Sequence, residues 1–576
     1  MTEVSSGPMP PSALRGDNRG DRVSGASWAS RSPALGRQGM AATSHPLASQ
    51  IAIDILKQGG SAVDAAIAAN AALGLMEPTG SGIGGDLFAI VWDPHSKKLH
   101  GLNASGRAPL GQTLDQLKDR LGGAAAIPDY GSLAVTTPGA VDGWFMLHDK
   151  FGKLPVTDIL APTIDYANSG FPVSQVIADH MQQHAESYPV AFERGAIEEI
   201  DNYRATYLID GKAPVEGQVF RNPDLGTTLA KIGRDGRNAF YRGEIADTID
   251  AYFHRIGGPL TKVDFEQHSG NWIEPVSTRY RGHDVWELPP NGQGIAALQM
   301  LNILEGFDLQ SMGHNSADHL HVMTEAKKLA FEDRARFYAD PDFYGVPLDG
   351  LLSKDYAAER RKLIQMDAAL QGIDHGDPKL LGGDTVYLTV ADADGMMVSL
   401  IQSNYMGMGS GLVPDGLGFM FQNRGTQFAL SDGHPNVYAP GKRPFHTIIP
   451  AFLTKDGKPV MSFGLMGGAM QPQGHAQIIV NMLDFGMTVQ EAGDAARFHH
   501  LGSTEPTWQG RMKDGGTLQL ESGVTRPVYD ELALRGHRLE ITTGPFGGYQ
   551  AIKRDPATGV YWGATEMRKD GSVTVY

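Results

Sequence analysis

Thr385 stands at a junction where cleavage of the chain would create a nucleophile. The polar, glycine- and proline-punctuated stretch 371–384 leads into a β-branched and aromatic run from Thr385 to Val390. This pattern predicts an exposed loop that runs directly into a strand. A cut between Asp384 and Thr385 would give Thr385 its own hydroxyl as nucleophile and its own freed α-amine as base. The alternative is an ordinary threonine at the start of a strand, where threonine is common.

Two other local patterns are suited to amide chemistry. The adjacent Gly467 and Gly468 would let two backbone N–H groups converge on one oxygen, which an oxyanion hole requires. Arg107, in a predicted loop, carries a planar guanidinium that can hold a carboxylate through two parallel hydrogen bonds. Taken alone, the glycines also fit a simple turn, and the arginine also fits a solvated surface charge.

Three further chemistries have weaker support. The glycine-rich segment 77–86 lacks the G-x-G-x-x-G spacing and a P-loop lysine, so a tight loop near an active site is favoured over a nucleotide site. His321 and Glu325 are four residues apart and share a face of a predicted helix. No third ligand occurs at a useful spacing, which favours a structural polar cluster over a metal site. The sequence has no G-x-S-x-G elbow, which argues against a Ser-His-Asp triad.

The surrounding sequence predicts the elements that would position these residues. An acidic, glycine-ended turn at 392–395 follows the Thr385 strand, and apolar residues resume at Val398, which predicts a β-hairpin. Residues 48–56 and 61–70 predict two helices, and 419–428 is interpreted as another strand. Strand and helix segments that alternate between glycine- and proline-rich turns indicate a layered α/β domain.

These motifs occur in the same order in a known family. From about residue 36 to its end, the sequence resembles the γ-glutamyltransferase family of N-terminal-nucleophile hydrolases, through the glycine-rich segment 77–86, the Asp384-Thr385 junction, the turn 442–444 and the Gly467-Gly468 pair. The resemblance implies a four-layer αββα sandwich, self-cleaved into a large subunit 36–384 and a small catalytic subunit 385–576. It also implies amide cleavage through an acyl–Thr385 intermediate, from which the acyl group passes to water or to an acceptor amine. The family uses no metal or organic cofactor.

The resemblance assigns further residues to the site, and this sequence departs from the family at several of them. Arg107 stands where the family grips the substrate carboxylate, Gly467 and Gly468 where it binds the oxyanion, and Ser403 and Thr447 retain hydroxyls. The departures are Tyr405 for an asparagine, His446 for a serine, Arg424 for a glutamine or glutamate, and Gln427 for an aspartate that pairs with the substrate ammonium. The expected substrates are γ-glutamyl or related carboxylate-bearing acyl amides. The alternative is an acyl group without the α-amine, as in glutaryl-cephalosporin acylases or oxamate amidohydrolases.

Composition limits the remaining functions. A chain of 576 residues with 41% hydrophobic content can bury a large core, and a net charge of −16 argues against nucleic-acid binding. The absence of cysteine excludes disulfides and thiolate chemistry, and no apolar run is long enough to span a bilayer. Residues 1–35 predict a disordered arm rather than a signal peptide, so a cytoplasmic location is expected.

The predicted partners are a small amide or peptide substrate and the two subunits themselves, with a dimer of these heterodimers left open. Two functions from other classes also stay open. One is a non-catalytic relative that only binds its ligand. The other is a protein that binds nucleotides through its glycine-rich loop.

Overall fold

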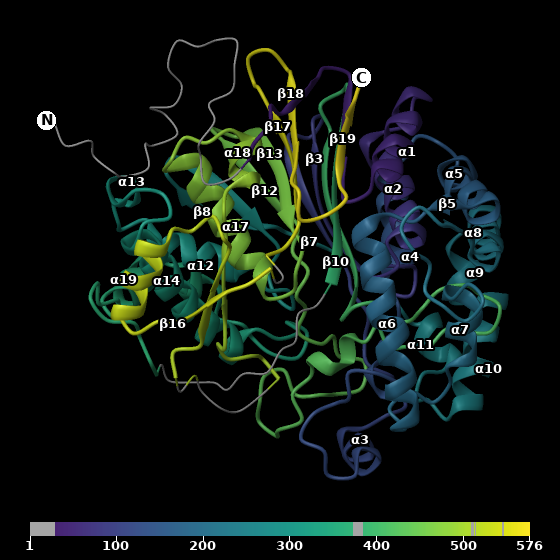
Figure 1. The fold of residues 1–576 in the computed structure, drawn as a ribbon. Coiled ribbons are helices and arrows are strands. Elements are labelled where there is room, and N and C mark those ends of the chain that lie inside the picture. The colour runs from purple at the N-terminus through teal and green to yellow at the C-terminus, as the bar shows by residue number, and fades with distance from the viewer. Residues whose placement is uncertain (1–28, 373–383, 508–511, 513, 544–545) are drawn as a thin grey trace, which may run out of the picture.

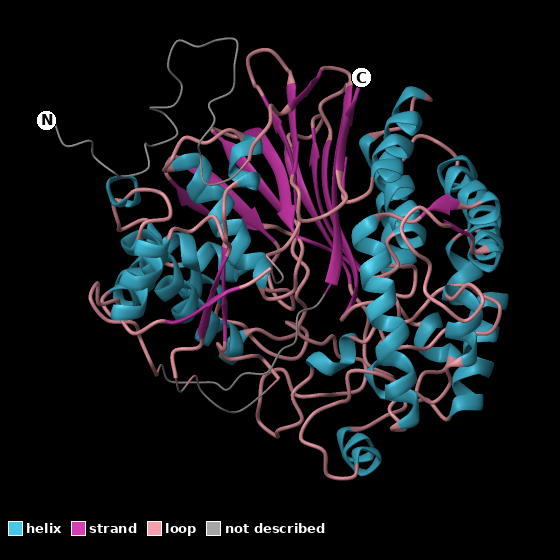
Figure 2. Cartoon of the chain, in the orientation of Figure 1, coloured by secondary structure: helices cyan, strands magenta, loops and turns pink. Residues whose placement is uncertain are grey.

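The computed structural model describes residues 29–372, 384–507, 512, 514–543 and 546–576. Within this part of the chain, two seven-stranded antiparallel sheets form the centre of the molecule (Figures 1 and 2). The first sheet has the order β19 (Ser572–Val575), β2 (Gly39–Thr43), β10 (Asp384–Asp392), β11 (Met397–Tyr405), β3 (Asp86–Asp93), β4 (Lys98–Ala104) and β7 (Asn271–Ile273). The second has the order β1 (Ala34–Gly36), β18 (Tyr561–Thr565), β17 (Tyr549–Arg554), β13 (Lys458–Leu465), β12 (Ala451–Lys455), β9 (His283–Glu287) and β8 (Val276–Tyr280).

Helices cover the outer face of each sheet, as Figure 2 shows. Beside the first sheet lie α1 (Pro46–Lys57), α2 (Ala62–Met76), α4 (Ala140–Phe151), α5 (Val156–Ser169), α6 (Gln175–Glu193), α7 (Asp201–Tyr207), α8 (Pro223–Asp235), α9 (Arg237–Tyr241), α10 (Glu244–Ile256) and α11 (Lys262–Glu266). Beside the second lie α12 (Gly294–Leu304), α13 (Leu309–Met312), α14 (Ala317–Phe337), α15 (Leu348–Leu352), α16 (Lys354–Arg361), α17 (Met470–Leu483), α18 (Val489–Asp494) and α19 (Arg526–Leu534). The predicted αββα sandwich is therefore confirmed.

A few shorter elements complete the fold. They are α3 (Leu114–Leu121), the 3₁₀ turns η1 (Ser132–Ala134) and η2 (Arg424–Gln427), the strand pair β5 (Phe171–Pro172) and β6 (Val219–Phe220), and a small sheet of β14 (Phe498–Leu501), β15 (Thr517–Leu520) and β16 (Arg538–Ile541).

Buried apolar side chains fill the three spaces between the four layers. One cluster joins α1 and α2 to the first sheet, a second joins α12, α14 and α17 to the second sheet, and a third lies between the sheets. The small residues of α2 are almost all buried, and a capping box between Ser61 and Asp64 fixes the start of the helix. Because both faces of each sheet are covered, all of β11 and β10 from Thr385 onward are buried.

The hairpin that begins at Thr385 forms as the sequence predicts. β10 pairs with β11 across a turn in which Gly395 has a φ of 92°, a left-handed value that favours glycine. Asp392 accepts the Met396 N–H through its side chain and so closes the same turn.

Two details of the sequence interpretation were wrong. Residues 419–428 do not form a strand but an irregular segment that ends in η2. The predicted disordered arm also extends too far, because Ala34 and Leu35 belong to β1 and pair with β18. Residues 1–28 of that arm, and residues 373–383 of the loop before Thr385, lie outside the described residues.

Candidate active site

Thr385 is the second residue of β10, and it is buried beside a β-bulge between Asp384 and Val386. Its hydroxyl donates to Ser403 Oγ at 3.3 Å, from the neighbouring strand β11. The backbone of Gly80 packs directly against Thr385, since a Cβ on that glycine would lie 3.1 Å from the Thr385 carbonyl carbon. The glycine-rich segment 77–86 therefore serves as a close-packed wall of this site, in line with the predicted tight loop.

Tyr405 links Ser403 to Arg424 and Gln427, two positions where this sequence departs from the family. Its N–H donates to Ser403 Oγ at 2.7 Å, and its φ of 80° is unusual for a bulky side chain. Its hydroxyl accepts from Gln427 Nε2 at 2.6 Å, and its ring lies 4.3 Å below the Arg424 guanidinium. Strained backbone of this kind is concentrated at functional sites, where the surrounding packing holds it in place.

Arg424 is fully buried, yet only part of its guanidinium is paired. Nη1 donates to Thr447 Oγ1 at 2.7 Å, whereas Nε and Nη2 have no hydrogen-bond partner among the described residues. Burial lowers the pKa of Arg424 to about 10, against the opposing effect of Asp86 and Tyr405, so the side chain is still charged at neutral pH. A buried cation with two unpaired donors is costly unless a ligand completes it.

His446 pairs with an acid that sequence analysis had not singled out. His446 Nδ1 accepts from the Ile448 N–H at 3.4 Å, so we assign the ring proton to Nε2, which donates to Asp86 Oδ2 at 3.1 Å. Burial lowers the pKa of His446 well below its usual range, which keeps the ring neutral. Burial also raises the pKa of Asp86 to about 7, although Arg424, Arg443 and two backbone N–H groups favour its ionised form.

The Gly467-Gly468 turn follows β13 and precedes α17, and its glycines have φ values of 115° and 57°. Two contacts between the sheets place this end of β13 beside the start of β10. Thr389 Oγ1 lies 2.6 Å from Ser462 Oγ, and Gly464 faces the ring of Tyr387. By the same alternation, we expect Thr385 and Met466, two residues further along each strand, to come to the same level.

Gln293 holds this turn next to Thr447. Its Nε2 donates to the carbonyl oxygens of Gly468 at 2.8 Å and of Thr447 at 2.7 Å. Neither the Gly467 nor the Gly468 N–H donates a hydrogen bond within the described part of the chain. Two unpaired amides at the level of Thr385 are the arrangement that an oxyanion hole needs.

Arg107 is paired with two acids in this structure. Its Nη2 is 3.2 Å from Asp342 Oδ2, its Nη1 is 3.6 Å from Asp340 Oδ2, and its side chain is 26% exposed. Both acids lie in the loop after α14, and the role of Arg107 in holding a substrate carboxylate stays a prediction. The structure brings together Thr385, Ser403, Tyr405, Arg424, Gln427 and Thr447, with Gly468 joined to them through Gln293.

Two supporting residues were missed by sequence reasoning. Asp86 is the last residue of the glycine-rich segment, and Gln293 lies in the loop before α12. Asp86 could have been found from the sequence. It is an acid at the end of a glycine-rich loop, and Arg424 and His446 stand at site positions where the family has no basic residue. Gln293 gave no such sequence signal, because a glutamine in a loop has no distinguishing pattern.

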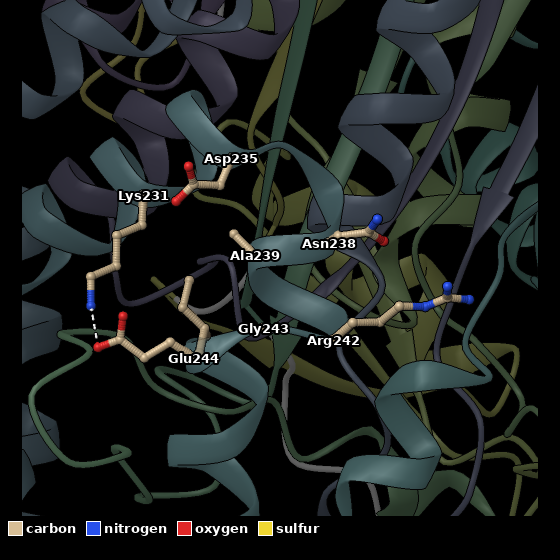
Figure 3. Close-up of a pocket in the computed structure, with 8 residues that line it drawn as sticks. Lys231, Asp235, Asn238, Ala239, Arg242, Gly243 and Glu244 are labelled. Atoms are coloured by element: carbon tan, nitrogen blue, oxygen red, sulfur yellow. Dashed lines mark hydrogen bonds and ion pairs between the residues drawn. The ribbon is translucent and has the colours of Figure 1, made fainter.

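A cavity of about 320 Å³ lies apart from these residues, among α8, α9 and α10. Figure 3 shows Lys231 paired with Glu244 at its edge, with Asp235, Asn238 and Arg242 nearby. None of the predicted site residues lines it, so we place no function there.

Comparison with known proteins identifies the class. The model of the gamma-glutamyltranspeptidase family matches residues 48–576. The chain is 37% identical to the glutathione hydrolase-like YwrD proenzyme of Bacillus subtilis, over 93% of this chain and 98% of that protein. It is 33% identical to the oxamate amidohydrolase proenzyme of Klebsiella pneumoniae, over 93% and 98% of the two chains.

A solved structure agrees with these relatives. The crystal structure of cephalosporin acylase from Bacillus halodurans matches with a TM-score of 0.87 and 43% identity, over 97% of this chain and 99% of that one. The chain therefore belongs to the gamma-glutamyltranspeptidase family of enzymes, whose members include hydrolases named as proenzymes. Within the described residues, no helix is both long and apolar enough to cross a membrane.

Proposed function

We propose that this protein is an amide hydrolase that cleaves itself before Thr385 and prefers acyl groups with a carboxylate but no α-amine. The observation that carries the proposal is the buried, half-paired guanidinium of Arg424, which is linked to Thr385 through Ser403 and Tyr405. A substrate carboxylate would satisfy both unpaired donors, Nε and Nη2, through a bidentate contact. In this proposal Arg424, rather than the acid-paired Arg107, makes the main contact with the carboxylate.

The same site is poorly suited to an ammonium group. Gln427 is neutral, and its Nε2 is already bonded to Tyr405. Asp86 is the nearby acid, but it is bonded to His446 and to the Gly106 N–H, and its raised pKa weakens its charge at neutral pH. A γ-glutamyl substrate would therefore bring a cation beside Arg424 without a dedicated partner, which costs roughly 2–5 kcal/mol.

The proposed reaction uses groups that lie together. The freed α-amine of Thr385 takes the hydroxyl proton as Oγ1 attacks the amide carbonyl, and the leaving amine departs with a proton. The N–H groups of Gly467 and Gly468 hold the oxyanion, and water then hydrolyses the acyl–Thr385 ester. Ser403 orients the hydroxyl of Thr385. None of these steps requires a metal or an organic cofactor.

The test compares glutaryl-p-nitroanilide with γ-glutamyl-p-nitroanilide on one enzyme preparation. We expect kcat/KM to be higher for the glutaryl compound by a factor of about thirty to a few thousand. The similarity to a cephalosporin acylase and an oxamate amidohydrolase favours this outcome, and the similarity to a glutathione hydrolase-like protein favours the reverse. A clear γ-glutamyl preference would mean that the protein is an ordinary transpeptidase with another acid at the ammonium position.

A further inference from the structure

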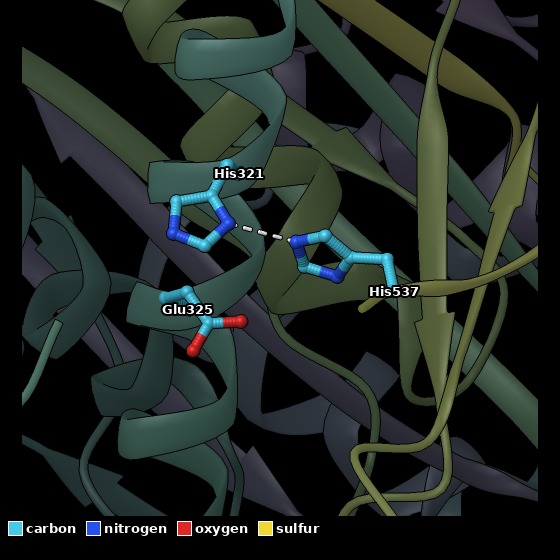
Figure 4. A group of neighbouring side chains, drawn as sticks. All are labelled: His321, Glu325 and His537. Carbon is cyan, nitrogen blue, oxygen red and sulfur yellow. Dashed lines mark hydrogen bonds between the residues drawn. The ribbon is translucent and has the colours of Figure 1, made fainter. Parts of the chain in front are cut away.

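Three potential metal ligands lie close together at the N-terminal half of α14, outside the Thr385 site. His321 and Glu325 lie one turn apart on that helix, and His537 approaches them from the residue before β16 (Figure 4). One ligand atom from each lies within 4.8 Å of the others, and all three residues are buried. Spacing along the chain did not suggest the third ligand, because His537 is more than 200 residues from the helical pair.

The His321 ring is oriented as a ligand. Its Nε2 lies 2.7 Å from the Gln365 carbonyl oxygen, which assigns the proton to Nε2 and leaves Nδ1 with a lone pair directed at His537 Nε2, 2.8 Å away. Metal-binding histidines usually donate their outer N–H to a carbonyl or carboxylate in this way, because that bond fixes the ring and its tautomer. Glu325 is held similarly, since its Oε2 accepts the Leu370 N–H at 3.0 Å.

The types of the three side chains suit the same role. Neutral imidazole is the form that binds a metal ion, and two imidazoles with one carboxylate are a ligand set typical of zinc.

We propose that His321, Glu325 and His537 bind a divalent transition-metal ion of the zinc class, with water as the fourth ligand. Without the ion, the proton on His537 Nε2 occupies its place and makes the hydrogen bond to His321. Binding requires that proton to move to His537 Nδ1, with no net release, and requires the two nitrogens to separate from 2.8 Å to about 3.3 Å, as two ligands of a tetrahedral ion do. Both adjustments are small.

Lys328 sets the affinity of this site. Its Nζ donates to Glu325 Oε1 at 2.8 Å and also to the Leu370 carbonyl oxygen at 3.0 Å. A cation at this distance competes with the metal ion for the carboxylate. Replacing Lys328 by an uncharged residue of similar size should therefore strengthen metal binding.

The position of the site gives it a structural consequence. His321 and Glu325 precede Thr385 in the chain, whereas His537 follows it. If the chain is cleaved as proposed above, the ion joins the two fragments. This consequence depends on the proposed cleavage, but the metal site itself does not.

The test measures metal binding directly by the full-length protein. Metal-free protein would be titrated with Zn²⁺ against a chromophoric chelator, and with Co²⁺ by visible absorption. We expect one ion per chain, tetrahedral Co²⁺ bands, at least tenfold weaker binding in His537→Gln, and tighter binding in Lys328→Met. His95→Gln is the matched control, because the side chain of His95 is 82% exposed and lies outside the cluster.

Two results would overturn the proposal. One is wild-type protein that gives no stoichiometric Zn²⁺ binding and no tetrahedral Co²⁺ spectrum. The other is equal loss of affinity in His95→Gln and His537→Gln, which would indicate adventitious binding at surface groups. If His537→Gln fails to fold, the wild-type cobalt spectrum and the Lys328→Met titration still decide the question. None of these measurements depends on enzymatic activity.

Discussion

At the level of single residues, we expect substrate preference to depend on the charge beside Arg424. The guanidinium packs on Tyr405, donates to Thr447 and has two further donors without a partner. Gln427 completes this group through its bond to the Tyr405 hydroxyl, but it contributes no charge. A carboxylate at position 427 would supply the negative partner that an α-ammonium needs, and it would also compete for Arg424.

We expect different effects from two substitutions whose new side chains are nearly isosteric with each other. Gln427→Asp should raise kcat/KM for γ-glutamyl-p-nitroanilide relative to the glutaryl compound by a factor of about ten or more, because the added charge contributes roughly 1.4 kcal/mol or more. Gln427→Asn shortens the side chain equally without adding charge, so it should leave the ratio nearly unchanged. Equal shifts in both variants would show that shape, and not charge, governs the preference.

The pH dependence of substrate binding follows from Asp86 at the start of β3. Burial raises the pKa of its carboxyl to about 7, and Arg424, Arg443 and His446 are the charged or titratable groups that face it at the site. Because the pKa is raised from its ordinary value of 3.8, the protonated carboxyl is the stabilising form. Its contribution to stability is full below about pH 4 and is lost as the pH rises through about 7.

Ionised Asp86 would partly neutralise Arg424, so we expect KM for a glutaryl substrate to increase between pH 6 and pH 8. In Asp86→Asn this increase should disappear, while the pH dependence of kcat that arises from the Thr385 amine should remain. Steady-state kinetics across this range measures both parameters. The same rise in KM in the variant would rule out Asp86 as its source.

At the scale of elements, we expect the turn between β13 and α17 to be the part of the proposed site most sensitive to substitution. Gly468→Val should lower kcat by about 10²–10³, the usual effect of losing one oxyanion donor, and should raise KM much less. Gly457→Val is a matched control, because Gly457 also has a positive φ, 71°, but lies in the turn before β13 with nothing within 4 Å of its Cβ position. Near-normal kcat in Gly468→Val, or an equal loss in Gly457→Val, would contradict the oxyanion assignment.

The elements that sequence could predict are those encoded by adjacent residues. The hairpin after Thr385 and the α1 and α2 helices follow from local periodicity and turn residues, and the Gly467-Gly468 turn lies where the motif suggests. The segment 419–428 was wrongly predicted to be a strand because it is rich in aromatic residues, which are common in strands. The chain there is instead irregular, with Gly411, Gly416 and Gly418 at positive φ in the approach to η2.

The contacts that sequence could not predict join residues far apart in the chain. Asp86 meets His446 from 360 residues away, and His537 meets His321 from 216 residues away. Arg107 illustrates the converse, since its motif was recognisable but its pairing with Asp340 and Asp342 was not. Such pairings depend on how the layers assemble, and no spacing rule encodes them.

For the whole molecule, the central claim is that the chain is a proenzyme activated at Thr385. The first sheet interleaves strands from both sides of that residue, with β10 between β2 and β11 and with β19 at the edge. Cleavage would therefore leave two fragments that share a sheet and a core, and they should stay together under native conditions. Cleavage should create the nucleophile without dismantling the fold.

Determination of the N-terminal residue of the small fragment tests this claim most directly. Purified wild-type protein should give two bands under denaturing conditions, and the smaller should begin at Thr385. Thr385→Ala should stay a single, inactive chain, whereas Thr385→Ser, which keeps a hydroxyl, should still be cleaved at the same bond. An intact wild-type chain that turns over substrate, or a small fragment that begins at another residue in active enzyme, would contradict the account.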